Sequence, residues 1–381
     1  MSESMNTSTE ATMAFPADYR EARTRFRDAA ERLGWACSAY PIGIAGPEDE
    51  ELTIDVAASS PRAAERVLVV SSGLHGVEGF LGSAIQLALL ERWRRQPGLP
   101  AGLRCVMLHA LNPYGFAWLR RCDADNIDPN RNFLLEGVEY RGGSEAYARL
   151  DGLLNPRRPP SRWDLFYPKM FWQLARLGMP ALKDAVAAGQ YDFPAGLFFG
   201  GSGPSRTRQI LQQHMKAWIG SAKSVVHLDL HTGLGGWGTY RLITDDTPSP
   251  AQRDWIARTF GPEAHDEGDS RDVAYQARGS LGRWCRARKF APEYLLAIAE
   301  FGTYGNLRVL AGLRAENQAH HWGRAQDRGT LRAKARLRDL FCPASTQWRT
   351  RALAQGTELV EKAIAGMLED PAAPTLSRAV S

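Results

Sequence analysis

The stretch that decides the fold runs from residue 66 to residue 94 and reads Arg66-Val-Leu-Val-Val-Ser-Ser-Gly-Leu-His75-Gly-Val-Glu78-Gly-Phe-Leu-Gly-Ser-Ala-Ile-Gln-Leu-Ala-Leu-Leu-Glu-Arg-Trp-Arg94. Residues 66–71 are an apolar run with the length of a buried strand, whereas residues 78–94 have the length and composition of a helix. A second apolar run, Leu103–Ala110, has the pattern of another buried strand. Because strand, helix and strand follow one another at this spacing, the sequence predicts a βαβ unit and a parallel sheet.

Further strands and helices are predicted on both sides of this unit. The upstream segments are a helix and two strands, at Asp18–Gly34, Cys37–Ile44 and Leu52–Ala58. The downstream strands are Val225–Leu230, Gly238–Thr244 and Tyr294–Glu300, and the downstream helices are Ser249–Phe260, Asn306–Trp322 and residues 326–369. Together these elements indicate an α/β fold, with a mixed, largely parallel central sheet flanked by helices.

Residues 144–222 have the pattern of a mainly helical insertion. It is interrupted by a proline-rich stretch, Asn155–Ser161, and by Phe193–Pro204, which contains the apolar and glycine-rich sequence Phe198-Phe-Gly-Gly-Ser-Gly. The length of 381 residues suits one large domain that carries such an insertion. We therefore expect a single domain over residues 15–370, with disordered tails at residues 1–14 and 371–381.

The composition argues against several classes of function. The formal charge is +5, but the arginines are scattered along the chain, so we expect no nucleic-acid partner. The five cysteines are odd in number and show no CxxC spacing, which argues against a disulfide framework and a cysteine zinc knuckle. A reducing, cytoplasmic location follows as the default. The sequence has neither a signal-peptide pattern nor an apolar run that could span a bilayer, so we expect no membrane partner.

Two of the predicted strands end in histidine, and each histidine has a carboxylate nearby. His75 and Glu78 follow the strand at residues 66–71, where glycines at positions 73, 76 and 79 let the backbone turn tightly. His231 ends the strand that starts at Val225, and Asp229 lies on the same strand face, where it could fix the tautomer of His231. Because open α/β sheets bind ligands at the carboxyl ends of their strands, His75, Glu78 and His231 form a candidate catalytic zinc site.

Each of these residues also has a structural explanation. The HxxE pattern is short, and a loop histidine followed by a glutamate at a helix N-terminus would produce it as well. His231 could cap a turn. His227 lies deeper in the same strand and fits a core histidine whose hydrogen bonds are satisfied within the fold.

Other polar residues could complete a catalytic site. Arg120, Arg121 and Arg131 lie in the long polar loop at residues 111–143, and an arginine near zinc can bind a carboxylate or stabilise a developing oxyanion. A solvated surface position is the alternative for Arg120 and Arg121. Glu300 ends an apolar strand and is a candidate general base, since burial would raise its pKa toward the working range. A glutamate that leaves the sheet into solvent would show the same pattern.

The motifs, in their order along the chain, resemble those of the zinc carboxypeptidase superfamily, including its succinylglutamate desuccinylase and aspartoacylase branch. They are His75-Gly-Val-Glu, Leu111-Asn-Pro-Tyr-Gly-Phe, Asp128-Pro-Asn-Arg-Asn-Phe, Asp229-Leu-His-Thr-Gly and Glu300-Phe-Gly-Thr. The resemblance extends from residue 50 to residue 325 and is closest to a little-characterised bacterial branch of zinc carboxypeptidase-like hydrolases. It implies a carboxypeptidase-like fold around the predicted sheet.

The resemblance also implies how a zinc ion and a substrate would be bound. His75, Glu78 and His231 correspond to the three ligands of one zinc ion, and Asp128 to the carboxylate that orients the first histidine. Asn130 and Arg131 are similar to the pair that binds the terminal carboxylate of the substrate.

The remaining correspondences concern catalysis. Arg121 is similar to the arginine that stabilises the oxyanion, with Arg120 as the near alternative, and Glu300 is similar to the general base. Residues 275–284 resemble the segment that carries the mobile tyrosine of digestive carboxypeptidases, which makes Tyr275 a candidate. An ordinary loop tyrosine is the other interpretation of that residue.

Two features depart from the superfamily pattern. Pro129 replaces the leucine or alanine usual at its position, and the insertion at residues 144–222 has no counterpart in digestive carboxypeptidases. The expected function is a zinc-dependent hydrolase that cleaves an amide bond next to a free carboxylate, in a peptide or a small molecule. The alternatives are an N-acyl amino acid deacylase and, in another class, a non-catalytic zinc- or ligand-binding module.

Overall fold

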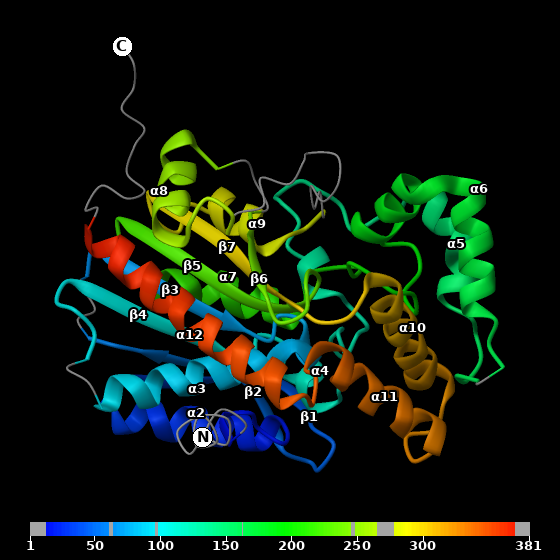
Figure 1. The fold of residues 1–381 in the computed structure, drawn as a ribbon, viewed down its shortest axis with the longest axis horizontal. Helices are drawn as coiled ribbons and strands as arrows, with labels where there is room; N and C mark the ends of the chain where they lie inside the picture. Colours follow the sequence, from blue (N-terminus) through cyan, green and yellow to red (C-terminus); the bar gives the residue numbers. More distant parts are fainter. Residues whose placement is uncertain are drawn as a thin grey trace.

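A seven-stranded sheet lies at the centre of the molecule, with its strands in the order β1-β2-β4-β3-β5-β7-β6 (Figure 1). The computed structural model describes residues 13–60, 64–95, 98–161, 163–244, 248–264 and 278–369. The strands are β1 (Ala36–Ala45), β2 (Glu51–Ala58), β3 (Arg66–Ser72), β4 (Leu103–His109), β5 (Ser224–Gly233), β6 (Tyr240–Ile243) and β7 (Glu293–Gly302). The four central strands, β4, β3, β5 and β7, are parallel, whereas β1, β2 and β6 form antiparallel pairs at the edges. The predicted mixed, largely parallel sheet is confirmed.

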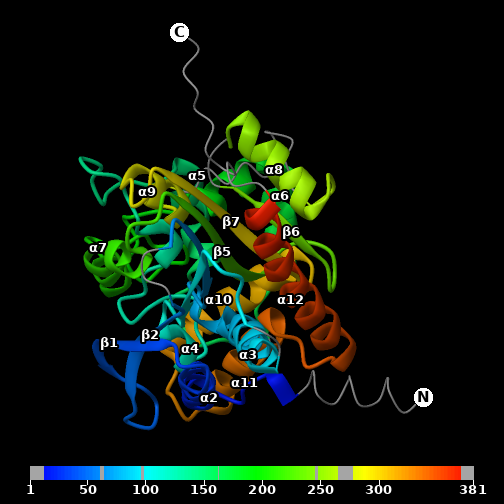
Figure 2. The same cartoon turned by 90° about the vertical axis from the view of Figure 1, so that its left-hand side faces the viewer.

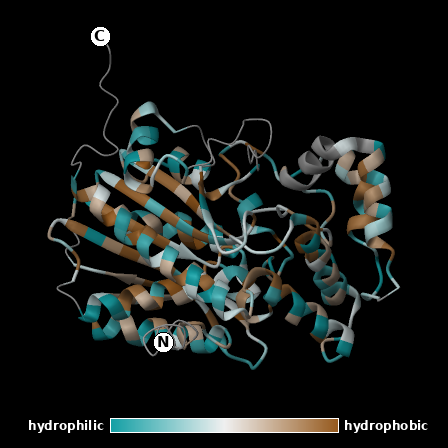
Figure 3. Ribbon diagram, in the orientation of Figure 1, coloured by the Kyte–Doolittle hydropathy of each residue, from teal (hydrophilic) through white to brown (hydrophobic). Residues whose placement is uncertain are grey.

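Helices cover both faces of this sheet, which explains why its central strands are apolar along almost their whole length (Figure 3). One face packs against α2 (Tyr19–Arg32), α3 (Gly79–Arg95), α8 (Pro250–Phe260) and α12 (Thr346–Glu369). The other face packs against α7 (Arg206–Ile219) and α9 (Leu281–Ala287), and Figure 2 shows α7 and α12 on opposite sides of the strands. The result is a three-layer α/β domain.

The remaining helices stand beside the sheet rather than on its faces. They are α4 (Pro113–Ala117), α5 (Glu145–Leu154), α6 (Phe166–Ala187), α10 (Asn306–Trp322), α11 (Arg328–Phe341) and two short 3₁₀ helices, η1 (Gly76–Glu78) and η2 (Pro129–Arg131). A third apolar cluster joins α5 and α6 to α10 and α11. In Figure 1 this group of helices lies to the right of the sheet.

Several helices begin at residues that the sequence marks as caps. The Asp18 side chain accepts a hydrogen bond from the backbone N–H of Glu21 at the start of α2. Ser249 and Gln252 form a reciprocal capping box at the start of α8, and Pro250 occupies its first turn. These local signals explain why the predicted and observed starts of both helices agree to within one residue.

The predicted domain boundaries stay predictions. The insertion at residues 144–222 contains α5, α6 and α7, of which α7 belongs to the helical layer on the sheet. Of the expected disordered tails, residues 1–12 and 371–381 lie outside the described part of the chain. Within the described ranges, no helix is both long and apolar enough to cross a membrane.

Gly76 is the point at which α4 touches the connection between β3 and α3. Its backbone N–H donates to the carbonyl of Arg121, and a Cβ atom added at Gly76 would collide with the backbone of Gly115 and Phe116. Backbone atoms cannot turn away as a flexible side chain can. Only glycine therefore lets the His75–Glu78 segment lie against α4.

We expect Gly76→Ala to lower the free energy of unfolding by about 1–3 kcal/mol, because the backbone has to shift to relieve the overlap. Gly152→Ala is the matched control, since Gly152 is an exposed position inside α5 with open space around it. There the same substitution should stabilise the protein by about 0.5–1 kcal/mol. Urea unfolding of the two variants measures both changes, and equal effects would contradict the packing described for Gly76.

Candidate metal centre and active site

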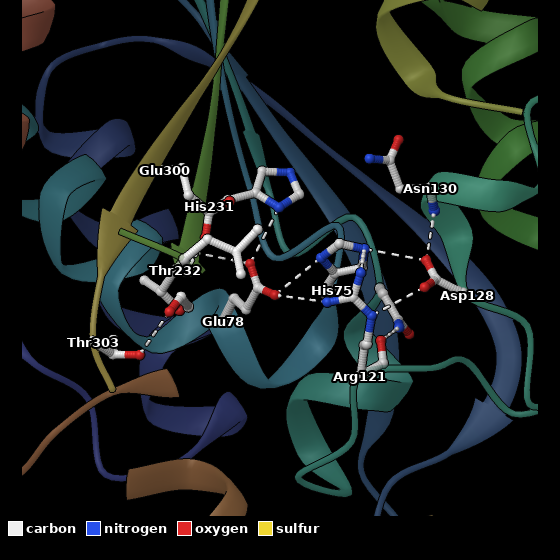
Figure 4. A network of polar contacts seen from close by, with 12 residues as sticks. His75, Glu78, Arg121, Asp128, Asn130, His231, Thr232, Glu300 and Thr303 are labelled. Atoms are coloured by element: carbon white, nitrogen blue, oxygen red, sulfur yellow. Dashed lines mark hydrogen bonds and ion pairs between the residues drawn. The ribbon is translucent and has the colours of Figure 1, made fainter. Parts of the chain in front are cut away.

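The ends of β3 and β5 bring two histidines to the same glutamate (Figure 4). After β3 the chain turns at Gly73, which has a φ of +64°, and places His75 and Glu78 at η1. His75 Nδ1 lies 2.9 Å from Glu78 Oε1, and His231 Nδ1 lies 3.1 Å from Glu78 Oε2. All three side chains are buried, and their potential ligand atoms lie within 4.8 Å of one another. The two imidazoles and the carboxylate thus face a common point.

A carboxylate also holds the far nitrogen of each imidazole. His75 Nε2 lies 3.1 Å from Asp128 Oδ1, and His231 Nε2 lies 2.7 Å from Asp229 Oδ2. A carboxylate favours the tautomer with hydrogen on Nε2, which leaves the Nδ1 lone pair for a ligand. At His75 this tautomer requires that Arg121 Nη2, which lies 2.7 Å from the same Nε2, donates its hydrogen elsewhere. Two such imidazoles and one carboxylate are a donor set that suits zinc and leaves a coordination position open. The residues present therefore fit a metal ion, and zinc in particular.

The electrostatics of this group favour a positive charge between the ligands. Burial alone would raise the pKa of Glu78, but the neighbouring His75 and His231 outweigh it and lower that pKa. Burial alone would lower the pKa of His231, but Asp229 and Glu78 hold it well above its usual value. A proton or a metal ion can supply the charge, and the two compete for the same nitrogen.

Arg121 is the arginine that the structure brings to this group. Its Nε donates to Asp128 Oδ2 at 3.0 Å, Nη1 donates to Glu78 Oε1 at 3.3 Å, and Nη2 lies 2.7 Å from His75 Nε2. Burial would raise the pKa of Asp128, but Arg121 and His75 hold it well below its usual range. The guanidinium also lies 5.9 Å from the centre of the Phe198 ring. Arg121 is therefore next to the candidate metal position.

Arg120 has different partners from its neighbour Arg121. Its Nε donates to Glu316 Oε1 on α10 at 3.0 Å, and its Nη2 donates to Asn126 at 2.8 Å and to Asn317 at 3.3 Å. None of these partners belongs to the group around Glu78. The structure thus ties Arg120 into a buried ion pair that joins the polar loop to α10, and separates it from the other predicted site residues.

Glu300 reaches the group from β7, the strand next to β5. It lies opposite His231 in the parallel register, and its Oε1 accepts a hydrogen bond of 2.8 Å from the backbone N–H of Leu234. Burial, assisted by the negative charge of Glu78, raises the pKa of Glu300 to about 7. A carboxyl group with a pKa near neutrality can accept and return a proton at the working pH.

Asn130 and Arg131 are buried in η2, directly after Asp128. The Asn130 side-chain oxygen accepts a hydrogen bond of 3.0 Å from the backbone N–H of Leu281, which leaves the amide NH₂ group to donate. Arg131 Nη1 donates to the carbonyl of Asn130 at 3.0 Å. Pro129 is the first residue of η2, a position whose N–H needs no intrahelical partner, so proline suits this loop.

Tyr275 lies outside the described residues.

Hydrogen bonds that the sequence did not indicate join residues 190–203 of the insertion to the loop at residues 128–132. Asp128 N–H donates to the carbonyl of Phe199 at 2.7 Å, Asn132 donates to the carbonyl of Gly200 at 2.8 Å, and Tyr191 donates to the carbonyl of Arg131 at 2.7 Å. Phe198 has a φ of +58°, unusual for a bulky residue. In the sequence, the glycine-rich stretch after Phe198 is the feature that could have indicated these contacts.

Comparisons with known proteins place the chain in a family. Residues 15–355 match the family described as "Protein of unknown function (DUF2817)". The chain belongs to this family. No curated protein sequence matches it.

Solved structures align with this family member at low sequence identity. Bovine thrombin-activatable fibrinolysis inhibitor, solved with a tick carboxypeptidase inhibitor, aligns with a TM-score of 0.50 and 11% identity over 93% of this chain and 98% of its own. A metallo-carboxypeptidase from Burkholderia cenocepacia aligns with a TM-score of 0.47 and 11% identity over 93% and 71% of the two chains. Murein-tripeptide amidase MpaA from Escherichia coli O157 aligns with a TM-score of 0.35 and 18% identity over 75% and 95%. The first alignment confirms the predicted carboxypeptidase-like fold.

The raised pKa of His231 leads to a prediction about metal binding. Because Asp229 and Glu78 hold the pKa of His231 well above its usual value, a zinc ion competes with a proton for this imidazole. The apparent zinc affinity should therefore rise with pH, by about tenfold per pH unit while one proton is released. Competition titrations with a chromophoric chelator at several pH values measure this slope, and an affinity independent of pH would contradict the competition between zinc and a proton at His231.

Proposed function

We propose that this protein is a zinc-dependent hydrolase that cleaves an amide bond next to a free carboxylate. The observation that carries the proposal is the convergence of His75 Nδ1, His231 Nδ1 and the Glu78 carboxylate, while Asp128 and Asp229 hold the opposite nitrogens. His75, Glu78 and His231 would bind one zinc ion. When bound, zinc supplies a Lewis acid that polarises a carbonyl and lowers the pKa of water.

Glu300 is the proposed general base. Its carboxylate would accept the proton of the attacking water and then deliver that proton to the nitrogen of the leaving amine. The pKa of about 7 that burial gives Glu300 suits both transfers at neutral pH. Its place opposite His231 on the neighbouring strand puts it at the same end of the sheet as the candidate metal ligands.

Arg121, Arg131 and Asn130 are the proposed substrate contacts. A guanidinium next to the reacting carbonyl stabilises the negative oxygen that forms there, which we assign to Arg121. Arg131 and the NH₂ group of Asn130 would bind a substrate carboxylate through charge-assisted hydrogen bonds. In this role Arg121 exchanges part of its contact with His75 and Glu78 for the substrate oxygen. Arg120, engaged with Glu316, has no part in the proposed reaction.

Deacylation of an N-acyl amino acid would use the same groups, because both reactions hydrolyse an amide next to a carboxylate. A panel of dipeptides, longer peptides and N-acyl amino acids, each with a free and an amidated carboxyl terminus, separates the two substrate classes. A module that only binds zinc or a ligand would hydrolyse none of them. The cytoplasmic location stays a prediction from the composition.

Glu300→Gln tests the assignment of the base. We expect kcat on the best substrate of the panel to fall at least about 100-fold, because the amide cannot accept the proton, while zinc remains bound. Glu293→Gln is the matched control, since Glu293 lies at the opposite end of β7, and this variant should keep normal turnover. Near-normal activity of Glu300→Gln would show that another group is the base.

A further inference from the structure

A line of hydrogen-bonded polar groups leads away from His231 through the apolar layer between the sheet and helices α7 and α9. Asp229 Oδ2 contacts His231 Nε2, and Asp229 Oδ1 accepts a hydrogen bond of 2.5 Å from Ser71 Oγ. Ser71 Oγ lies 2.7 Å from His227 Nε2, and His227 Nδ1 lies 2.8 Å from Tyr294 Oη. The groups between Tyr294 and His231 therefore form one continuous chain.

The sheet register explains how these groups meet. His227, Asp229 and His231 alternate along β5 and so project to one face. Ser71 lies beside Asp229 on β3, while Tyr294 comes from the start of β7. All five side chains are buried, and the surrounding residues of this layer are apolar.

Polar groups in such a layer are costly unless every one of them is paired. Apolar side chains at these positions would stabilise the fold equally well. The complete pairing of the chain, and its end at a candidate metal ligand, point to a role in the site.

Only one assignment of donors and acceptors fits the hydrogen bonds of this chain. Ser71 has a single hydroxyl hydrogen and donates it to Asp229, so it must accept from His227 Nε2–H. Burial lowers the pKa of His227 to about 4, so its ring is neutral and its Nδ1 accepts the hydroxyl hydrogen of Tyr294. Asp229 therefore accepts from both sides, from the Ser71 hydroxyl and from His231 Nε2–H. This leaves Nδ1 of His231 as the ligand atom.

We propose that Ser71, His227 and Tyr294 are positioning residues that hold Asp229, and through it the His231 imidazole, in the orientation and tautomer that bind the metal ion. This inference rests on the proposed role of His231 as a zinc ligand. It extends the site by three residues beyond the carboxylate that contacts the histidine. In metal sites generally, residues that hydrogen-bond to the ligands contribute to the metal affinity.

The test is the zinc affinity of four variants, measured by competition with a chromophoric chelator at fixed pH. Ser71→Ala and His227→Leu break the chain and should weaken zinc binding at least about tenfold. Tyr294→Phe removes one hydroxyl without a change of shape and should weaken binding by a smaller factor. His227→Gln keeps a donor toward Ser71 and should bind zinc more tightly than His227→Leu.

Tyr19→Phe is the matched control, because the buried Tyr19 hydroxyl donates to the Thr53 carbonyl at 2.9 Å on the other side of the sheet. It loses a buried hydrogen bond as Tyr294→Phe does and should keep the wild-type zinc affinity. Cobalt-substituted protein gives a second readout, since a reoriented His231 would shift the visible absorption bands in Tyr294→Phe and leave them unchanged in Tyr19→Phe.

The outcomes separate this proposal from the proposed function. If the wild type binds zinc and Tyr294→Phe, Ser71→Ala and His227→Leu bind it equally well with unchanged cobalt spectra, the positioning role is wrong and the zinc site stands. If the wild type itself binds no zinc, the proposed function fails, whatever the variants do. Should Ser71→Ala or His227→Leu not fold, the isosteric Tyr294→Phe decides.

Discussion

The rest of the site depends on the contact of the Glu78 carboxylate with two histidines, His75 and His231. One of its oxygens faces His75, and the other faces His231 and accepts the backbone N–H of Thr232 at 3.0 Å. It thereby links the ends of β3 and β5, which are neighbours in the sheet. Buried negative charge is stable only when positive charge lies close to it. The carboxylates of Glu78, Asp128 and Asp229 carry three buried negative charges, which a divalent cation between the histidines and Arg121 together would balance. The fourth buried carboxyl group, that of Glu300, has a pKa raised to about 7.

The parallel sheet brings the charged groups of the site close enough together to balance one another. The carboxyl ends of β3, β5 and β7 meet at one edge, so residues far apart in the sequence come together without long excursions of the chain. Gly76 allows the β3–α3 connection to lie against α4, and the polar loop then carries Asp128 and Arg121 to His75. Residues 190–203 hold that loop through one backbone hydrogen bond and two hydrogen bonds donated by side chains.

Much of the fold could be predicted because the sequence patterns that mark strands and helix starts involve residues close together in the chain. The apolar runs of β3, β4, β5 and β7 identify buried strands, and Asp18 and Ser249 mark helix starts. The side chains at the strand ends could be grouped because parallel strands end at one edge. Helix α9 was not predicted, because its seven residues are too few for a clear periodicity.

The parts that could not be predicted depend on partners distant in the sequence. Arg120 and Arg121 are adjacent and chemically identical, yet Glu316 pairs with the first and Asp128 with the second. Likewise, the sequence indicated a satisfied core histidine at His227, but not that Ser71 and Tyr294 would connect it to Asp229. The neighbours of a side chain decide its role here, and only the folded structure brings them together.

The zinc content of the purified protein is the most direct test of the central claim. After incubation with zinc and removal of the excess, the account predicts about one zinc ion per chain in the wild type and in His214→Ala, a substitution in the aromatic cluster around Tyr40. His231→Ala should lose the ion while remaining folded. A wild-type protein that takes up no zinc, or a His231→Ala variant that retains it as tightly as the wild type, would contradict the account.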